Sequence, residues 1–193
     1  MEKQTRLVQI GGGPIGGGSQ VAVKSMLSCP AADETGNVEQ DKRLQKAGCA
    51  ILRVSVPAME DVRLVPAIKQ AVDIPLVADI HFDYRIALAA VAAGVDKVRI
   101  NPGNIGGDDR VAAVTKACRA KGVPIRIGVN GGSLEKDLLV QYGGPVAEAL
   151  VESAMEHVRY LEARNFYDTK ISLKSSSVTD TIEAYRLMSA RYD

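Results

Sequence analysis

The sequence predicts an α/β fold of the TIM-type (β/α) barrel class, with about six of the eight βα units and a preceding N-terminal β-hairpin. Short runs rich in β-branched residues alternate with segments of helical periodicity, which favours parallel strands joined by right-handed crossovers. These runs also carry charged or amide residues toward their C-terminal ends. Barrel enzymes place their chemistry at that end of the strands.

Composition narrows the functional classes. A chain of 193 residues with 46% hydrophobic and 24% charged residues can bury a core as one globular unit. Its formal net charge of +1 provides no general attraction for nucleic acid, so anion binding requires local clusters of arginine and lysine. No apolar run approaches the roughly 20 residues of a membrane helix, and the N-terminus lacks a signal peptide pattern, so we expect a cytoplasmic protein. The three cysteines have no C-x-x-C spacing, which favours reduced thiols.

The first stretch of the chain predicts the hairpin. Residues 5–10 and 21–26 are expected as strands, and the glycine-rich stretch 11–18, with Pro14 and Ile15 at its centre, as the turn between them. Glycine clusters can also cradle phosphate, but this one lacks the G-K-[ST] ending of a P-loop. We therefore interpret it as a turn.

The remaining elements follow in alternation. Strands are expected at 51–56, 76–80, 97–101, 125–130 and 169–174, and helices at 37–47, 59–72, 84–93, 108–120, 146–163 and 178–191. Gly48, Gly94 and Gly122 each follow a helix and are expected to end it. A closed barrel needs eight units and about 250 residues, so the sheet is either open or the front part of a longer protein. We favour truncation and treat residues 1–193 as the N-terminal part of a barrel domain.

Side chains alternate across a strand, so odd and even positions predict which residues lie on an apolar face and which on a polar face of the sheet. The polar residues that share a face are Arg53 with Ser55, Asp79 with His81, Arg99 with Asn101, Arg126 with Asn130, and Lys170 with Ser172 and Lys174.

The cationic members of this set indicate an anion site. Arg53, Arg99 and Arg126, with Lys170 or Lys174, would converge from neighbouring strands, and such a gathering is unfavourable unless an anion fills the space. A phosphate or diphosphate is the ligand that fits best. The alternative is that the arginines form internal ion pairs with nearby acids, which would be Asp79, Asp83 or Asp96.

Two further groups complete the candidate site. Asp79 and His81 could serve acid–base catalysis or hydrogen-bond a substrate hydroxyl, and a metal is less favoured because no third ligand is evident. Asn101, Asn104 and Asn130 lie beside glycines in loops beyond strands, where amides can meet a bound oxyanion, although both residue types are also ordinary in turns.

At these positions the chain closely resembles the 4-hydroxy-3-methylbut-2-enyl diphosphate synthase family of isoprenoid biosynthesis. The matching strings are PIGGG (14–18), RVSVP (53–57), VADIHFD (77–83), VRINPGNIG (98–106), RIGVN (126–130), GSLEKD (132–137) and KISLK (170–174). The resemblance implies a barrel that binds 2-C-methyl-D-erythritol 2,4-cyclodiphosphate, with Arg53, Arg99, Arg126 and a lysine of the last strand holding the diphosphate.

The resemblance also implies parts that this chain does not show. In the family a separate C-terminal domain carries a 4Fe-4S cluster, receives electrons from ferredoxin or flavodoxin, and closes over the partner's barrel in a homodimer. Cys29, Cys49 and Cys118 do not match the family's cluster motif, so no cluster or other metal is expected on this chain and the fragment alone should be inactive. The chain departs from the family at Lys24, usually glutamine, and at Leu27-Ser28-Cys29, usually Thr-Asn-Thr.

Two other functional classes stay open. The chain could be a structural or dimer-forming fragment, because an incomplete barrel leaves an open strand edge. It could also be a different barrel enzyme, such as a relative of dihydropteroate synthase, which shares the fold and the habit of binding anions.

Overall fold

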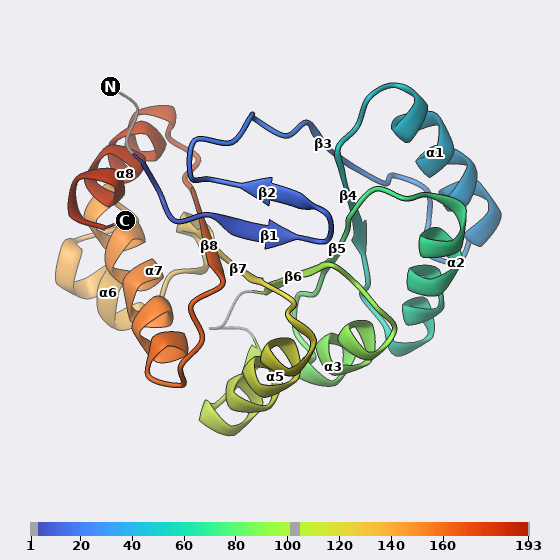
Figure 1. Cartoon of the computed structure of the whole chain (residues 1–193). Coiled ribbons are helices and arrows are strands. Elements are labelled where there is room, and N and C mark those ends of the chain that lie inside the picture. The colour runs from blue at the N-terminus through green and yellow to red at the C-terminus, as the bar shows by residue number, and fades with distance from the viewer. Residues whose placement is uncertain (1–3, 101–104, 193) are drawn as a thin grey trace.

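A curled sheet of six parallel strands forms the centre of the molecule, whose computed structural model describes residues 4–100 and 105–192. Figure 1 shows the strands following one another around the sheet in chain order. They are β3 (Lys24–Met26), β4 (Ile51–Ser55), β5 (Leu76–Asp79), β6 (Lys97–Ile100), β7 (Ile125–Asn130) and β8 (Thr169–Lys174). The pairing of the described residues does not join β3 to β8. The predicted barrel class, with about six units, is confirmed.

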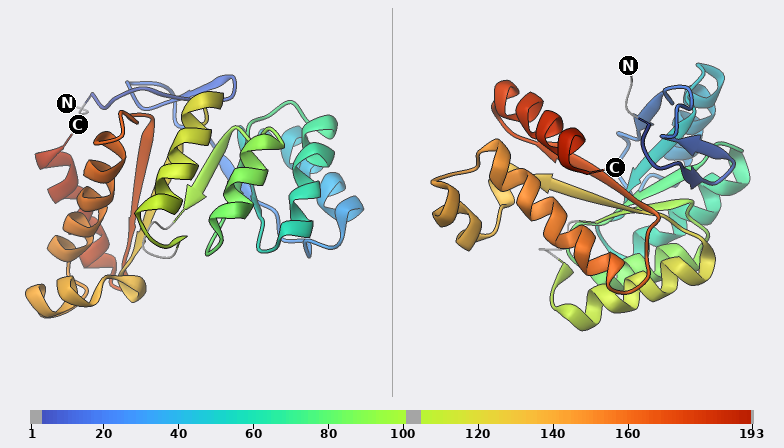
Figure 2. Two further views of the ribbon diagram at one scale, coloured as in Figure 1. Left: turned by 90° about the horizontal axis from the view of Figure 1, so that it is seen from below. Right: turned by 60° about the vertical axis from the view of Figure 1, so that its left-hand side comes forward.

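Helices cover the convex side of this sheet, as the views in Figure 2 show. They are α1 (Glu34–Lys46), α2 (Leu64–Ala71), α3 (Tyr84–Ala92), α5 (Asp108–Lys121), α6 (Lys136–Tyr142), α7 (Ala147–Glu162) and α8 (Val178–Arg191), with short 3-10 turns at η1 (Met59–Arg63) and η2 (Gly131–Ser133). None of the helices in the described part of the chain is long and apolar enough to cross a membrane.

Local chemistry sets several helix ends. The side chains of Asp33, Asp83 and Ser177 accept hydrogen bonds from backbone N–H groups in the first turns of α1, α3 and α8, and so satisfy donors that the helix leaves unpaired. At the other end of α5, Gly122 adopts a φ of 65°, which a residue with a Cβ rarely takes. The predicted helix-ending role of Gly122 is confirmed.

The main core lies between the convex face of the sheet and the helices. Strand residues of one parity, such as Leu52, Val54, Ile80 and Ile100, are buried in it, and helix residues such as Leu150 pack against them. Parity therefore places these aliphatic residues outside the curl and leaves the alternate positions facing the concave side, where they are apolar at the starts of β4 and β5 and polar further along.

The N-terminal hairpin covers the start of the concave face. β1 (Val8–Ile10) pairs antiparallel with β2 (Gly13–Ile15), and Ile10 forms a small second core with Ile51 and Val77. These partners stand at the beginning of β4 and β5, so the hairpin closes the N-terminal end of the sheet. In Figure 1 the hairpin lies inside the curl of the sheet.

Several predicted boundaries were wrong. Ile15 and Pro14 belong to the second hairpin strand rather than to the turn, which shrinks to residues 11–12 because φ of 55° at Gly11 permits a tight reversal. The segment 21–26 is not that strand, since its last residues form β3 of the parallel sheet. The helix expected at 59–72 is a 3-10 turn followed by α2, and α6 was not predicted.

We expect Ile10→Ala to lower the free energy of unfolding by about 2–5 kcal/mol, because it removes a fully buried side chain from the contact between hairpin and sheet. Denaturant unfolding followed by circular dichroism measures this. Val21→Ala is the control, since Val21 is 90% exposed. Equal stabilities for the two variants would contradict the assigned role of the hairpin.

Candidate functional site

One row of residues crosses five neighbouring strands on the concave face. The register pairs Ser55 with Asp79, Asp79 with Arg99, Arg99 with Arg126, and Arg126 with Lys170. Paired residues in a parallel sheet point to the same side, so these side chains share one level of the concave face. The structure thus brings together groups that are more than a hundred positions apart in the sequence.

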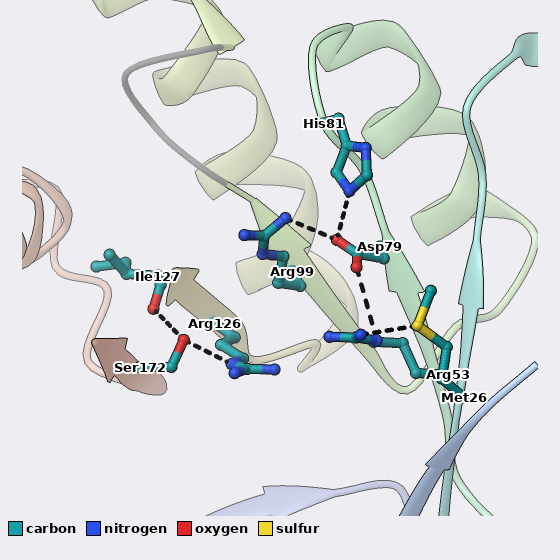
Figure 3. Close-up of polar contacts among 8 residues, drawn as sticks. All are labelled: Met26, Arg53, Asp79, His81, Arg99, Arg126, Ile127 and Ser172. Atoms are coloured by element: carbon teal, nitrogen blue, oxygen red, sulfur yellow. Dashed lines mark hydrogen bonds and ion pairs between the residues drawn. The ribbon is translucent and has the colours of Figure 1, made fainter. Parts of the chain in front are cut away.

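Asp79 lies at the centre of the first half of this row (Figure 3). Its Oδ1 atom is 3.0 Å from Arg99 Nη1 and 3.4 Å from His81 Nε2, and its Oδ2 atom is 3.6 Å from Arg53 Nε. Asp79 is buried, whereas the His81 side chain is 42% exposed. One carboxylate therefore orients two guanidinium groups and an imidazole that reaches solvent.

Arg126 lies apart from this cluster and has a different partner (Figure 3). Its Nε donates to Ser172 Oγ at 3.0 Å, and that hydroxyl donates to the Ile127 carbonyl at 3.3 Å. Among the described residues, no carboxylate forms an ion pair with Arg126. Burial, followed by the charges of Arg53 and Arg99, lowers the pKa of its guanidinium. An anion beside Arg126 would relieve this repulsion.

Lys170 extends the cationic row onto the edge strand. Burial and the neighbouring Arg126 lower the pKa of the Lys170 ammonium. Further along the same strands, Asn130 pairs in register with Lys174, so both lie nearer the C-terminal rim. Asn101 and Asn104, also predicted for the site, lie outside the described residues.

The site predicted from the sequence left out two cations of this face, Lys97, which was not noticed, and Lys24, which was named only as a departure from the family pattern. Lys97 shares the parity of Arg99 and is 2% exposed, while Lys24 begins the first parallel strand. Burial, then Lys170 and Lys24, lowers the pKa of Lys97 to about 7, and burial, then Arg126, lowers that of the less covered Lys24 to about 8. Lys97 could have been found from the sequence, because it stands two residues before Arg99 on the same strand and so shares its face.

Gly128 makes room for Arg99. A Cβ atom at position 128 would lie 2.7 Å from Arg99 Nε and 3.0 Å from its Nη2. The guanidinium therefore passes directly over the backbone of β7, and the absence of a side chain there lets Arg99 reach Asp79.

The alternative of internal ion pairs holds only in part. Arg53 and Arg99 do pair with Asp79, but Asp83 pairs with Arg85 and Asp96 with Lys69. Asp96 Oδ2 also accepts from the Leu76 backbone N–H, which ties it to the start of β5. Asp83 and Asp96 thus pair with other cations and do not neutralise Arg53, Arg99 or Arg126. The concave face therefore keeps an excess of positive charge.

The cysteines do not form a ligand set. Cys49 and Cys118 are buried and Cys29 is half-buried, all three as free thiols. The described ranges contain no group of three or more His, Cys, Asp or Glu side chains that could hold a metal ion. Burial raises the pKa of Cys118 to about 12, which keeps it a protonated thiol. The described residues therefore do not fit an iron-sulfur cluster.

The curled βα sheet, with cations gathered on its concave face, defines a protein of the TIM-barrel class. Residues 5–193 match the GcpE TIM-barrel domain, and the chain belongs to the GcpE family. It is 54% identical over 191 residues to the 4-hydroxy-3-methylbut-2-en-1-yl diphosphate synthase (flavodoxin) of Maridesulfovibrio salexigens, covering 99% of this chain and 53% of that protein. The synthase of the same name from Caldanaerobacter subterraneus subsp. tengcongensis is 51% identical over 193 residues, covering 100% of this chain and 54% of the relative.

The chain thus spans about half the length of the curated relatives it matches. Among solved structures, the dihydropteroate synthase of Xanthomonas albilineans in complex with 7,8-dihydropteroate superposes with a TM-score of 0.63 at 17% identity, covering 93% of this chain and 69% of that one. The Yersinia pestis dihydropteroate synthase gives 0.62 at 15% identity, covering 94% and 68%. These likenesses show the fold alone.

We expect Lys97→Met to stabilise the protein most at low pH. Lys97 titrates near 7 when folded and near 10.5 when unfolded, so the unfolded state binds more protons between these values and the stability of the unmodified protein rises with pH there. Below pH 7 the variant should gain a few kcal/mol, and the gain should shrink toward pH 10. Unfolding at several pH values tests this, with the exposed Lys42→Met as control. A gain independent of pH would be inconsistent with a neutralised Lys97.

Proposed function

We propose that this chain is the substrate-binding barrel portion of a 4-hydroxy-3-methylbut-2-en-1-yl diphosphate synthase, and that it binds 2-C-methyl-D-erythritol 2,4-cyclodiphosphate on its concave face. The observation that carries the proposal is the row in which Arg99, Arg126 and Lys170 stand side by side on adjacent strands. The name shared by the most similar relatives supports the choice of substrate.

The cations hold the diphosphate in this proposal. Arg126 and Lys170, which have no carboxylate partner among the described residues, would contact the phosphoryl oxygens most directly, and Arg99 and Arg53 would complete the site from the Asp79 side. Charge-assisted hydrogen bonds from guanidinium groups to phosphoryl oxygens are short and strong. Ser172, Asn130 and Lys174 line the path toward the rim, and Asn101 and Asn104 are proposed to join them.

Asp79 and His81 are proposed to act on the non-phosphate part of the substrate. Asp79 pairs with two arginines, and it fixes the orientation of His81. The exposed His81 imidazole could then donate a hydrogen bond or a proton to an oxygen of the carbon skeleton. In this division of roles the buried acid positions the imidazole, and the imidazole meets the substrate.

Reductive ring opening needs two electrons. A flavodoxin, as in the names of the relatives, or a ferredoxin would supply them, and a 4Fe-4S cluster would relay them to the substrate one at a time. We propose that the cluster belongs to the half of the protein that the chain does not span, that the whole enzyme is a cytoplasmic homodimer, and that the barrel portion alone binds substrate without turning it over.

The two other classes make different predictions. A dihydropteroate-synthase-like enzyme would bind a pterin and not the cyclodiphosphate. A purely structural fragment would bind neither, and would associate through the unpaired edge of β8. The sequence identity of 54% to a synthase, against 17% to a dihydropteroate synthase, favours the first proposal.

Titration of the chain with the cyclodiphosphate in a calorimeter tests the proposal. We expect Arg126→Gln to weaken binding about ten-fold or more, because it removes a charge-assisted contact worth roughly 1.5–3 kcal/mol. This variant leaves the ion pairs of Asp79 intact, so the fold should persist. Arg43→Ala, on the exposed side of α1, is the control and should bind as the unmodified chain does.

Two results would count against this function. One is no binding by a chain whose circular dichroism shows a folded protein. The other is equal affinity for the unmodified chain and Arg126→Gln. Pterin binding in place of cyclodiphosphate binding would select the dihydropteroate-synthase-like alternative.

A further inference from the structure

A cavity lies inside the curl of the sheet. It has a volume of about 230 Å³ and is lined by residues near the starts of the strands, together with residues of the hairpin segment and α8. The polar and charged lining residues are Lys24, Lys97, Arg126, Lys170, Ser172 and Tyr185. Ile15 and Ile51 contribute apolar wall at the hairpin side. Four of the lining side chains are cations.

The position of this cavity separates it from the cluster around Asp79. Lys97 stands two residues before Arg99 on β6, toward the N-terminal end of the strand, and Lys24 is the first residue of β3. Ile51, the first residue of β4, marks the same level and packs against Ile10 of the hairpin. The cavity therefore lies between the hairpin and the row that carries Arg99 and Arg126.

Acidic side chains of the described residues do not neutralise the cations that line the cavity. No aspartate or glutamate within residues 4–100 and 105–192 lines it, and the acid whose charge reaches Lys24 is Asp79, which is already paired with Arg53 and Arg99. Lys97 is 2% exposed, and no hydrogen bond or ion pair of its ammonium occurs in the described part of the chain. A buried ammonium without a partner is costly, and a bound anion would remove that cost.

We propose that this inner cavity is a second anion site, which takes one small oxyanion such as inorganic phosphate on Lys97, Lys170 and Lys24. Its volume is below the roughly 300–1,000 Å³ of pockets for drug-sized ligands, so a compact anion suits it better than a large one. Ser172 and Tyr185 add hydroxyl groups near the cations. This site borders the proposed diphosphate site at Arg126, Lys170 and Ser172, and extends from them toward Lys97 and Lys24, which the diphosphate site does not use.

The titration of the lysines is consistent with this assignment. The pKa of Lys97 falls to about 7 because burial and the neighbouring cations disfavour its charge. An anion among these groups would favour the charged ammonium and raise that pKa again. Binding should therefore be accompanied by proton uptake near neutral pH. The charged groups facing Lys97 are Lys170, Lys24, Arg126 and Arg53.

Thermal unfolding of the 193-residue chain in increasing phosphate, with chloride adjusted to keep the ionic strength constant, tests the proposal. A ligand that binds the folded state raises the Tm in proportion to the logarithm of its concentration above Kd. We expect such a rise for the unmodified chain, at least a ten-fold weaker phosphate response for Lys97→Met, and a weaker response for Lys24→Gln. Lys42→Met, at an exposed position of α1, is the control and should respond as the unmodified chain does. Arg99→Ala is measured alongside and should keep more of the phosphate response than Lys97→Met.

Three outcomes would overturn the proposal. The first is no phosphate-dependent shift in the unmodified chain. The second is an unchanged response in both Lys97→Met and Lys24→Gln. The third is loss of the response in Arg99→Ala with retention in Lys97→Met, which would place phosphate beside Asp79 instead. Binding of the cyclodiphosphate is tested separately, by the calorimetric titration of the unmodified chain and Arg126→Gln. A failure of one proposal can therefore be told from a failure of the other.

Discussion

The concave face of this protein is governed by an imbalance of charge. Asp79 is one carboxylate, and around it or along the same sheet stand Arg53, Arg99, Arg126, Lys97 and Lys170. Like charges held on rigid strands cannot move apart, and desolvation makes their repulsion stronger. The convex core must therefore supply enough stability to hold these cations together.

Stability and binding are assigned to opposite faces of the same strands. Residues of one parity, such as Leu52 and Val98, are buried under the helices, while the next residue along, Arg53 or Arg99, carries its charge into the curl. The hairpin packs against the start of the concave face through Ile10 and shields that end from solvent. Burial by the hairpin also strengthens the electrostatic effects at that end, because fewer water molecules screen the lysines.

The alternation of apolar and polar residues along the strands made most of the sheet and much of the candidate site predictable from the sequence. They placed Arg53, Asp79, Arg99 and Arg126 on one face, and the strands 125–130 and 169–174 have the predicted bounds. The hairpin bounds were wrong because glycine and proline weaken the strand signal in β2. Lys97 was overlooked because a lysine at the start of a strand is usually solvated, and only the register shows how deeply it lies. Which arginines pair with Asp79 depends on the conformations of their side chains, and the sequence pattern does not specify these.

Gly128 ties two positions of different strands to each other. Since any Cβ there would meet the guanidinium of Arg99, a relative that carries alanine or serine at 128 would have to shorten or redirect the residue at 99. The two sites should therefore change together over evolutionary time. A designer who wishes to place a side chain at position 128 would therefore have to change or reorient Arg99 as well, whereas a shorter residue at position 99 can be introduced alone.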